Sequence, residues 1–119
     1  MIKFFENVKC GWWNGLKRID NDRVIIGYEF LNIISISKNI ILKNINISYV
    51  CFGIQNIENK GIFLVGGCEK DIIIFRNDNY ECIKIIKNAH NKAINGYVEL
   101  NDESILSYSN DGFISVWTY

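Results

Sequence analysis

The feature that most constrains this chain is the run of residues 89–117, in which short apolar segments alternate with polar turns. The apolar segments have the length and the composition of β-strands. Asn110, Asp111 and Gly112 lie between the last two segments and supply residue types that accept positive φ in a tight hairpin. The run therefore predicts an antiparallel meander. Its predicted strands are residues 94–100, 105–109 and 113–117.

The same order of strands and turns recurs in weaker form before this run. Residues 13–36 align with residues 94–117 without a gap, and the spacing between corresponding glycines gives a repeat of about 40 residues. The sequence predicts a single domain, 1–119, with units at about 10–45, 46–88 and 89–119 and an additional strand at 2–9. The remaining predicted strands are residues 39–45, 47–55, 62–67, 72–76 and 80–87.

The last unit carries a specific resemblance. His90 precedes its first strand, Asp111 and Gly112 form its second turn, and Trp117 ends its third strand. This arrangement resembles a blade of a WD-repeat β-propeller. The resemblance implies an all-β fold made of four-stranded antiparallel blades, about three per chain. Two positions depart from the family pattern, since Ala89 stands in place of its glycine and Thr118 in place of its aspartate.

Three residues of this unit, His90, Ser107 and Asp111, are the residue types of a nucleophilic triad. The Gly-x-Ser-x-Gly turn that exposes a nucleophilic serine does not surround Ser107. The resemblance implies instead that the three residues and Trp117 form a buried hydrogen-bond relay, which satisfies every polar group without catalysis. We therefore predict that the protein is not an enzyme.

The first two units lack this set of polar residues. The position of Trp117 is taken by Ile36 in the first unit and by Phe75 in the second, and neither unit has a histidine. We expect apolar packing alone to hold their blades together. The positions equivalent to Asp111 and Ser107 carry Phe30, Glu69, Ile26 and Val65.

Composition argues against several classes of function. Thirteen basic residues balance thirteen acidic ones, so no net field attracts nucleic acid or an anionic membrane. Apolar runs are too short to span a bilayer, and residues 1–9 lack a signal-peptide core, which predicts a cytoplasmic protein. The chain has four cysteines, none of them in a Cys-x-x-Cys pair, and a single histidine. We therefore predict that the thiols are buried and that the protein has neither a metal site nor a cofactor.

The function predicted from the resemblance is that of a non-enzymatic protein-interaction scaffold. Partners of this family usually bind the face formed by the turns between second and third strands and by the links between blades. Adjacent Trp12 and Trp13 point to opposite sides of a strand, so one of them is a candidate for exposure. The candidate residues for binding a protein partner are Trp12, Tyr28, Glu29, Glu69, Lys92 and Asn110.

Three blades are fewer than the smallest closed propeller needs. One solution is a homodimer of six blades, in which residues 2–9 of each chain complete the last blade of the other. A second is that complementary blades come from a longer chain. The third is a β-trefoil, which closes as a monomer and would bind a ligand or a sugar.

Overall fold

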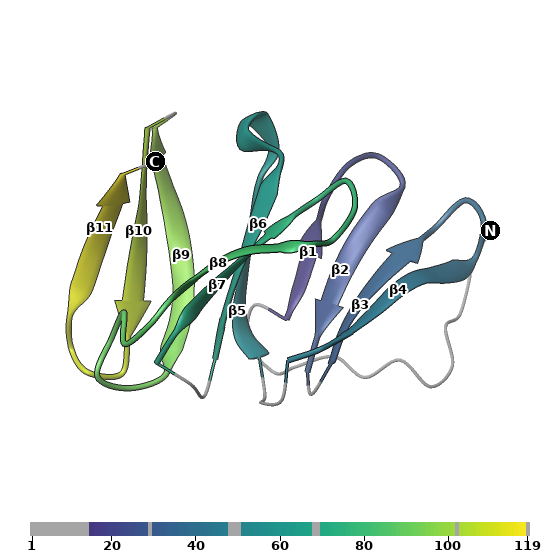
Figure 1. The fold of residues 1–119 in the computed structure, drawn as a ribbon. Coiled ribbons are helices and arrows are strands. Elements are labelled where there is room, and N and C mark those ends of the chain that lie inside the picture. Colours follow the sequence, from purple (N-terminus) through teal and green to yellow (C-terminus); the bar gives the residue numbers. More distant parts are fainter. Residues whose placement is uncertain (1–14, 29, 48–50, 68–69, 102, 119) are drawn as a thin grey trace.

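A computed structural model describes residues 15–28, 30–47, 51–67, 70–101 and 103–118 (Figure 1). These residues form three antiparallel sheets, which stand side by side along the longest dimension of the molecule, 42 Å. The first sheet contains β1 (Leu16–Arg18), β2 (Arg23–Gly27), β3 (Phe30–Ser35) and β4 (Ile40–Asn46). The second contains β5 (Cys51–Ile57), β6 (Ile62–Gly67), β7 (Ile72–Arg76) and β8 (Cys82–Ile86), with the 3-10 helix η1 (Glu58–Lys60) after β5. The third contains β9 (Ile94–Asn101), β10 (Ser104–Ser109) and β11 (Ile114–Thr118).

Each sheet is an up-and-down meander in which consecutive strands pair. This confirms the predicted all-β fold of blade-like sheets, and β6 and β7 have the bounds that the sequence predicted. Within the described residues no strand of one unit pairs with a strand of another, so the architecture is not a β-trefoil. The predicted strand 2–9 lies outside the described residues.

Turn residues set the ends of the strands. Gly112 has a φ of 84°, as expected in the tight turn before β11. Gly61 ends η1 in the left-handed conformation, within the turn predicted between β5 and β6. Tyr80 has a φ of 64°, so the chain turns at this residue and β8 begins at Cys82 rather than at Tyr80.

The register of the first sheet corrects the gapless alignment. Val24 pairs with Ile34, whereas in the third sheet Ile105 pairs with Trp117. The link between β2 and β3 is shorter than the link between β10 and β11. The position equivalent to Trp117 is therefore held by Ile34, and the placement at Ile36 was wrong. Phe30 likewise belongs to β3 and not to a turn.

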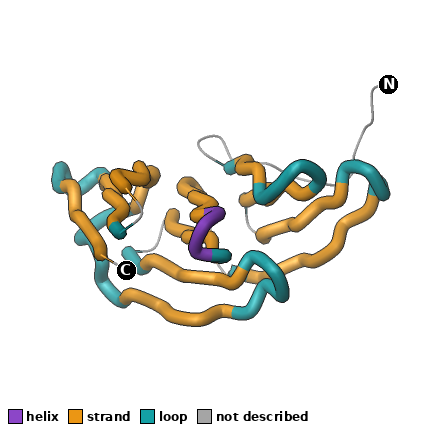
Figure 2. Tube along the Cα trace, turned by 90° about the horizontal axis from the view of Figure 1, so that it is seen from above, coloured by secondary structure: helices purple, strands orange, loops and turns teal. Residues whose placement is uncertain are grey.

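The three sheets lie next to one another (Figure 2). Apolar side chains fill the space between neighbouring sheets. Between the first and second sheets, the core includes Ile25, Ile33 and the stacked rings of Phe63 and Phe75, whose centroids lie 5.1 Å apart. Between the second and third sheets, it includes residues that point the opposite way from the second sheet, such as Leu64 and Ile72, and Ile94 and Ile105 from the third. The second sheet is thus buried on both faces.

The first strands of the second and third sheets come very close together. A Cβ atom on Gly53 would lie 3.1 Å from Gly96 Cα, so β5 and β9 approach backbone to backbone. Only glycine permits this distance without movement of the neighbouring strand. At Gly66 of β6 an added Cβ would lie 2.6 Å from Tyr97 Oη and 3.0 Å from Ile94 Cβ, so side chains of β9 fill the space beside this glycine. The inner edges of these two sheets are therefore packed against each other.

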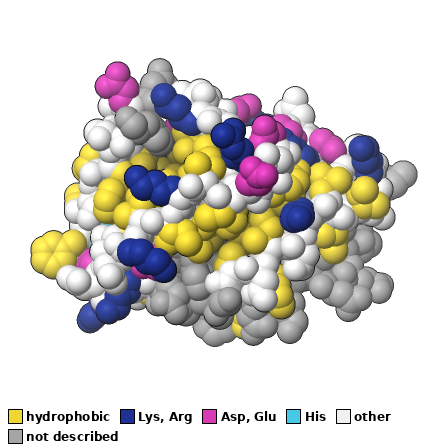
Figure 3. Space-filling model, in the orientation of Figure 1, with side chains coloured by type: hydrophobic (Ala, Val, Ile, Leu, Met, Phe, Trp, Pro, Cys, Tyr) yellow, Lys and Arg dark blue, Asp and Glu magenta, His cyan; other side chains and the backbone are white. Residues whose placement is uncertain are grey.

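The last strands of the first two sheets lie at the outer edge and are mostly exposed. Ile41 of β4 and Ile85 of β8 are both exposed. Hydrophobic side chains gather across the middle of the face drawn in Figure 3, with basic residues scattered among them. Cys82 of β8 is an exposed free thiol, so the prediction of a buried thiol was wrong at this position.

Arg23 joins the first sheet to the second by polar contacts. Its Nε donates to Asp20 Oδ2 at 2.8 Å, and one terminal nitrogen donates to Asn77 O at 2.7 Å and to Tyr80 Oη at 2.8 Å. Asn56 Nδ2 donates to Ile19 O at 3.1 Å and extends this connection. Two of these partners are 54 and 57 residues away in the sequence, so no local pattern indicates the connection.

We expect Arg23→Lys to lower the free energy of unfolding by about 1 to 2 kcal/mol, because an ammonium cannot reach all three partners at once. Urea unfolding followed by circular dichroism measures this change. Arg18→Lys is the matched control, since Arg18 is exposed on β1 and its substitution should change stability by less than about 0.5 kcal/mol. Equal losses for the two variants would contradict the role of Arg23.

Candidate functional site

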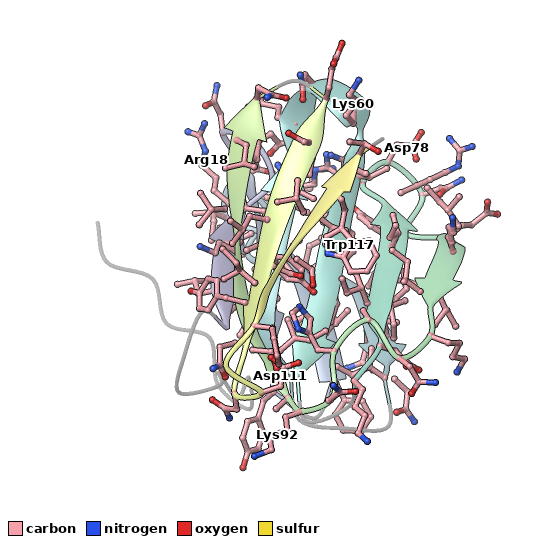
Figure 4. All side chains as sticks on the ribbon, turned by 90° about the vertical axis from the view of Figure 1, so that its left-hand side faces the viewer. Arg18, Lys60, Asp78, Lys92, Asp111 and Trp117 are labelled. Atoms are coloured by element: carbon pink, nitrogen blue, oxygen red, sulfur yellow. The ribbon has the colours of Figure 1, made fainter. Side chains whose placement is uncertain are left out.

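The four polar residues predicted to act together come from four different segments of the third unit. His90 lies in the link between β8 and β9, Ser107 on β10, Asp111 in the turn after β10, and Trp117 on β11. Figure 4 shows Trp117 on its strand and Asp111 at the end of the sheet, with Lys92 near it. The antiparallel pairing of β10 with β11 brings the serine and the indole to the same side.

These side chains are linked by short hydrogen bonds. Trp117 Nε1 donates to Ser107 Oγ at 2.8 Å, and Ser107 Oγ lies 2.7 Å from His90 Nε2. His90 Nδ1 lies 3.1 Å from Asp111 Oδ2. An indole can only donate, so the serine accepts from Trp117, and its own proton is available to His90 Nε2. The neutral tautomer with hydrogen on Nδ1 then donates to Asp111, and every member has a partner.

Asp111 also closes the turn and fastens the link that enters the third sheet. Its Oδ1 accepts from Phe113 N at 2.8 Å and its Oδ2 from Asn91 N at 2.9 Å. Desolvation raises the pKa of Asp111, but the N–H groups of Asn91 and Phe113 and the ring of His90 outweigh it and hold the pKa below its ordinary value. His90 N donates to Lys70 O at 3.2 Å, so the same link is tied to the second sheet.

The arrangement has the residue types of a triad but not the access that catalysis needs. Ser107 is 0% exposed and His90 is 3% exposed. The serine oxygen is already bonded to an indole and an imidazole, and no open position lies beside it for a carbonyl carbon. The arrangement instead pairs four buried polar groups by hydrogen bonds. It thereby connects the link before β9, the turn after β10, and the strands β10 and β11.

The other two units are held by different contacts. Val65 is fully buried where the third unit has its serine, and Phe75 stacks on Phe63 where it has its tryptophan. In the first unit Asp22 Oδ2 accepts from Ser35 Oγ at 2.6 Å. That bond, with the donors of Ser37, lowers the pKa of Asp22 to about 2. Asp22 therefore joins β3 to the turn before β2.

Three of the residues predicted to bind a partner lie at one end of the sheets. Tyr28 follows β2, Asn110 follows β10, and Lys92 precedes β9, and these strand ends point the same way (Figure 1). Asn95 Nδ2 donates to Asn110 Oδ1 at 2.7 Å, and Ser109 Oγ donates to Lys92 O at 3.1 Å, so both loops are held in place. We call Tyr28, Lys92 and Asn110 the turn face.

The other three candidates, Trp12, Glu29 and Glu69, lie outside the described residues. Arg18, Lys60 and Asp78 mark the opposite end of the molecule in Figure 4. In the described part of the chain, no group of three or more histidine, cysteine or acidic side chains is arranged to hold a metal ion. The same residues include no helix long and apolar enough to cross a membrane.

No family model and no curated protein sequence matches the chain. Solved structures, in contrast, do match its fold. The crystal structure of the RRP9 WD40 repeats superposes with a TM-score of 0.79 at 16% identity, covering 87% of this chain and 34% of that one. The computationally designed Ika4 protein superposes with a TM-score of 0.72 at 15% identity, covering 87% of this chain and 63% of that one.

At such low identity these likenesses establish the fold alone. The chain spans about a third of the RRP9 structure and less than two thirds of the designed protein. The three sheets thus have the arrangement of successive blades in a WD-repeat β-propeller, as the residues of the last unit indicated.

We expect Ser107→Ala to lower the free energy of unfolding by about 1 to 3 kcal/mol, because it removes the acceptor of the Trp117 indole and leaves His90 Nε2 buried without a donor. Chemical unfolding with circular dichroism measures the loss. Ser115→Ala, on the neighbouring strand and outside the relay, is the control, with an expected change within about 0.5 kcal/mol. A Ser107 variant as stable as this control would contradict the relay.

Acid should weaken the third unit through Asp111. Its pKa is lower in the folded than in the unfolded chain, so its stabilising contribution is present above the ordinary carboxyl pKa, about 4, and is lost as pH falls below that value. In Asp111→Asn, unfolding free energy measured from pH 6 to pH 3 should fall less steeply than in the unmodified chain. An unchanged slope would contradict this assignment.

Proposed function

We propose that this chain is a non-enzymatic protein-interaction scaffold of the WD-repeat type, which binds a protein partner through its turn face. The observation that carries the proposal is the burial of the triad-like residues. Ser107 and His90 are enclosed in the core, so these residues, which have the types of a catalytic triad, serve the fold. The molecule then presents to other proteins a rigid surface with polar side chains at its turns.

The turn face has the physical character of a binding surface. Tyr28 combines an aromatic ring with a hydroxyl, and such residues contribute strongly to protein interfaces. Lys92 and Asn110 are exposed on loops that hydrogen bonds to β9 and β10 hold in place. Side chains on fixed loops lose little conformational freedom on binding, which favours affinity. Trp12, Glu29 and Glu69 extend the proposed surface as sequence-based candidates.

Other properties follow from the sequence and stay predictions. These are the cytoplasmic location, the absence of a cofactor and the absence of a role in binding nucleic acid. A ligand-binding or sugar-binding function belonged to the β-trefoil alternative, and no observation favours it.

The proposal is tested by affinity purification with quantitative mass spectrometry, comparing the unmodified chain with the triple variant Tyr28→Ala, Lys92→Ala and Asn110→Ala. We expect the variant to lose at least about 80% of the specifically captured partner, because hot-spot side chains carry most of the binding energy. A triple variant at the opposite end, Arg18→Ala, Lys60→Ala and Asp78→Ala, is the matched control. Circular dichroism confirms folding of both.

Equal recovery of the same partner with the two triple variants would remove the turn face as its binding site. Hydrolytic activity that disappears in Ser107→Ala, while the variant stays folded, would overturn the non-enzymatic assignment.

A further inference from the structure

A groove opens on the outer side of the molecule, between the first and second sheets. It has a volume of about 500 Å³, and its walls come mainly from β4 on one side and from β7 and β8 on the other. The apolar side chains that line it include Ile45, Ile73, Phe75 and Ile85. A concave site of this size, with an apolar lining and a few polar groups, is typical of small-molecule binding.

Lys43 is the only charged residue among the described residues that line this groove. It lies on β4 opposite Ile33 and two positions before Ile45, so the side chains of Lys43 and Ile45 point to the same side of the strand. No ion pair joins Lys43 to an acidic side chain within the described part of the chain. Its ammonium group can therefore pair with one negative charge on a ligand.

Tyr80 supplies a second polar group in the same groove. Its Oη accepts a hydrogen bond from a terminal nitrogen of Arg23 at 2.8 Å, and the guanidinium carbon of Arg23 lies 5.9 Å from the centre of the Tyr80 ring. A guanidinium can only donate, so the proton of the Tyr80 hydroxyl is still available to an acceptor. The groove thus offers one charged donor and one neutral donor, and Arg23 holds the neutral one in place.

The lysine recurs one repeat later. Lys84 lies on β8 opposite Ile74 and lines the groove between the second and third sheets, which has a volume of about 360 Å³. Among the described residues of that lining, Lys84 is again the only charged one. A lysine that faces an apolar groove is therefore a feature of the repeated unit and not of a single strand.

We propose that the groove beside Lys43 binds a small aliphatic carboxylate, with the carboxylate on Lys43 and the hydrocarbon chain against β7 and β8. If each carbon group takes about the 30 Å³ of one water, the groove has room for a chain of roughly eight to twelve carbons and its carboxylate. A single carboxylate suits this lining better than a phosphate, because a second negative charge would lack a partner in an apolar groove.

This site goes beyond the proposed scaffold function. It does not require a β-trefoil either, since both of its walls belong to the four-stranded meander sheets.

Cys82 gives a readout confined to this groove, because its exposed thiol is part of the lining. The test follows the alkylation of Cys82 by iodoacetamide in the full chain at increasing octanoate, with mass spectrometry of the peptide that contains this residue. We expect saturating octanoate to slow the reaction about fivefold or more, because the reaction needs access to the thiol. The uncharged analogue 1-octanol should need a concentration about tenfold higher for the same protection.

A substitution at Lys43 tests the charge pairing. Lys43→Met keeps most of the side-chain length and removes the charge, so octanoate should then protect Cys82 no better than 1-octanol does. Lys84→Met is the matched control, because Lys84 lies on the same strand as Cys82 but lines the other groove, and there the preference for octanoate should persist. Each rate is compared with the rate of the same variant without ligand.

A second comparison uses the unmodified chain, in case a variant fails to fold. Hexanoate should need a concentration about tenfold higher than octanoate, because it buries two methylene groups fewer. Octanoate that leaves the alkylation rate unchanged, or 1-octanol that protects equally well, would overturn the proposal. So would protection that appears with rising protein concentration alone, because a second copy would then cover the groove. The turn face shares no residue with this lining, so these outcomes are independent of partner capture.

Discussion

Burial of apolar side chains between neighbouring sheets is the interaction on which the rest of this structure depends. The second sheet illustrates it, because Phe63, Val65 and Phe75 face the first sheet while Leu64 and Ile72 face the third. A strand with apolar residues on both sides cannot be stable with either side in water. The three units therefore hold one another in place, and no single sheet contains its own core.

Polar contacts then fix the positions that apolar packing leaves undefined. The burial of apolar side chains has no preferred direction and by itself would let neighbouring sheets slide past each other. A hydrogen bond prevents such sliding, because it requires a defined distance and angle between two atoms. Arg23 and Asn56 supply such bonds between the first and second sheets, and His90 supplies one between the second and third through Lys70 O. Glycine at positions 53 and 66 lets the second and third sheets approach each other closely.

The third sheet combines the most complete polar relay with the most open surroundings. Its relay links His90, Ser107 and Trp117 by hydrogen bonds to one another, and these bonds fix the positions of the side chains within the sheet. Val98, Ile114 and Val116 are nevertheless exposed on its strands, and β11 has an unpaired edge among the described residues.

Much of the architecture was predictable from the sequence because it depends on local pattern. Continuous apolar runs bounded by polar turns located β6 and β7 to the residue, and the polar turns located the hairpins. The four residues of the relay were also identifiable, since their types and spacing match a known blade. The register of the first sheet was not, because one short link between β2 and β3 moves Ile34 into the place expected for Ile36.

What the sequence by itself determined is the repeated unit, since strand period and turn chemistry act within a few residues. Only the tertiary structure decided which units touch and through which atoms. Arg23 finds two of its partners more than fifty residues away, and the groove between the second and third sheets takes its lining from both sheets. Contacts of this kind depend on how whole sheets stack, and stacking is governed by the summed shape of many side chains rather than by any local run of residues.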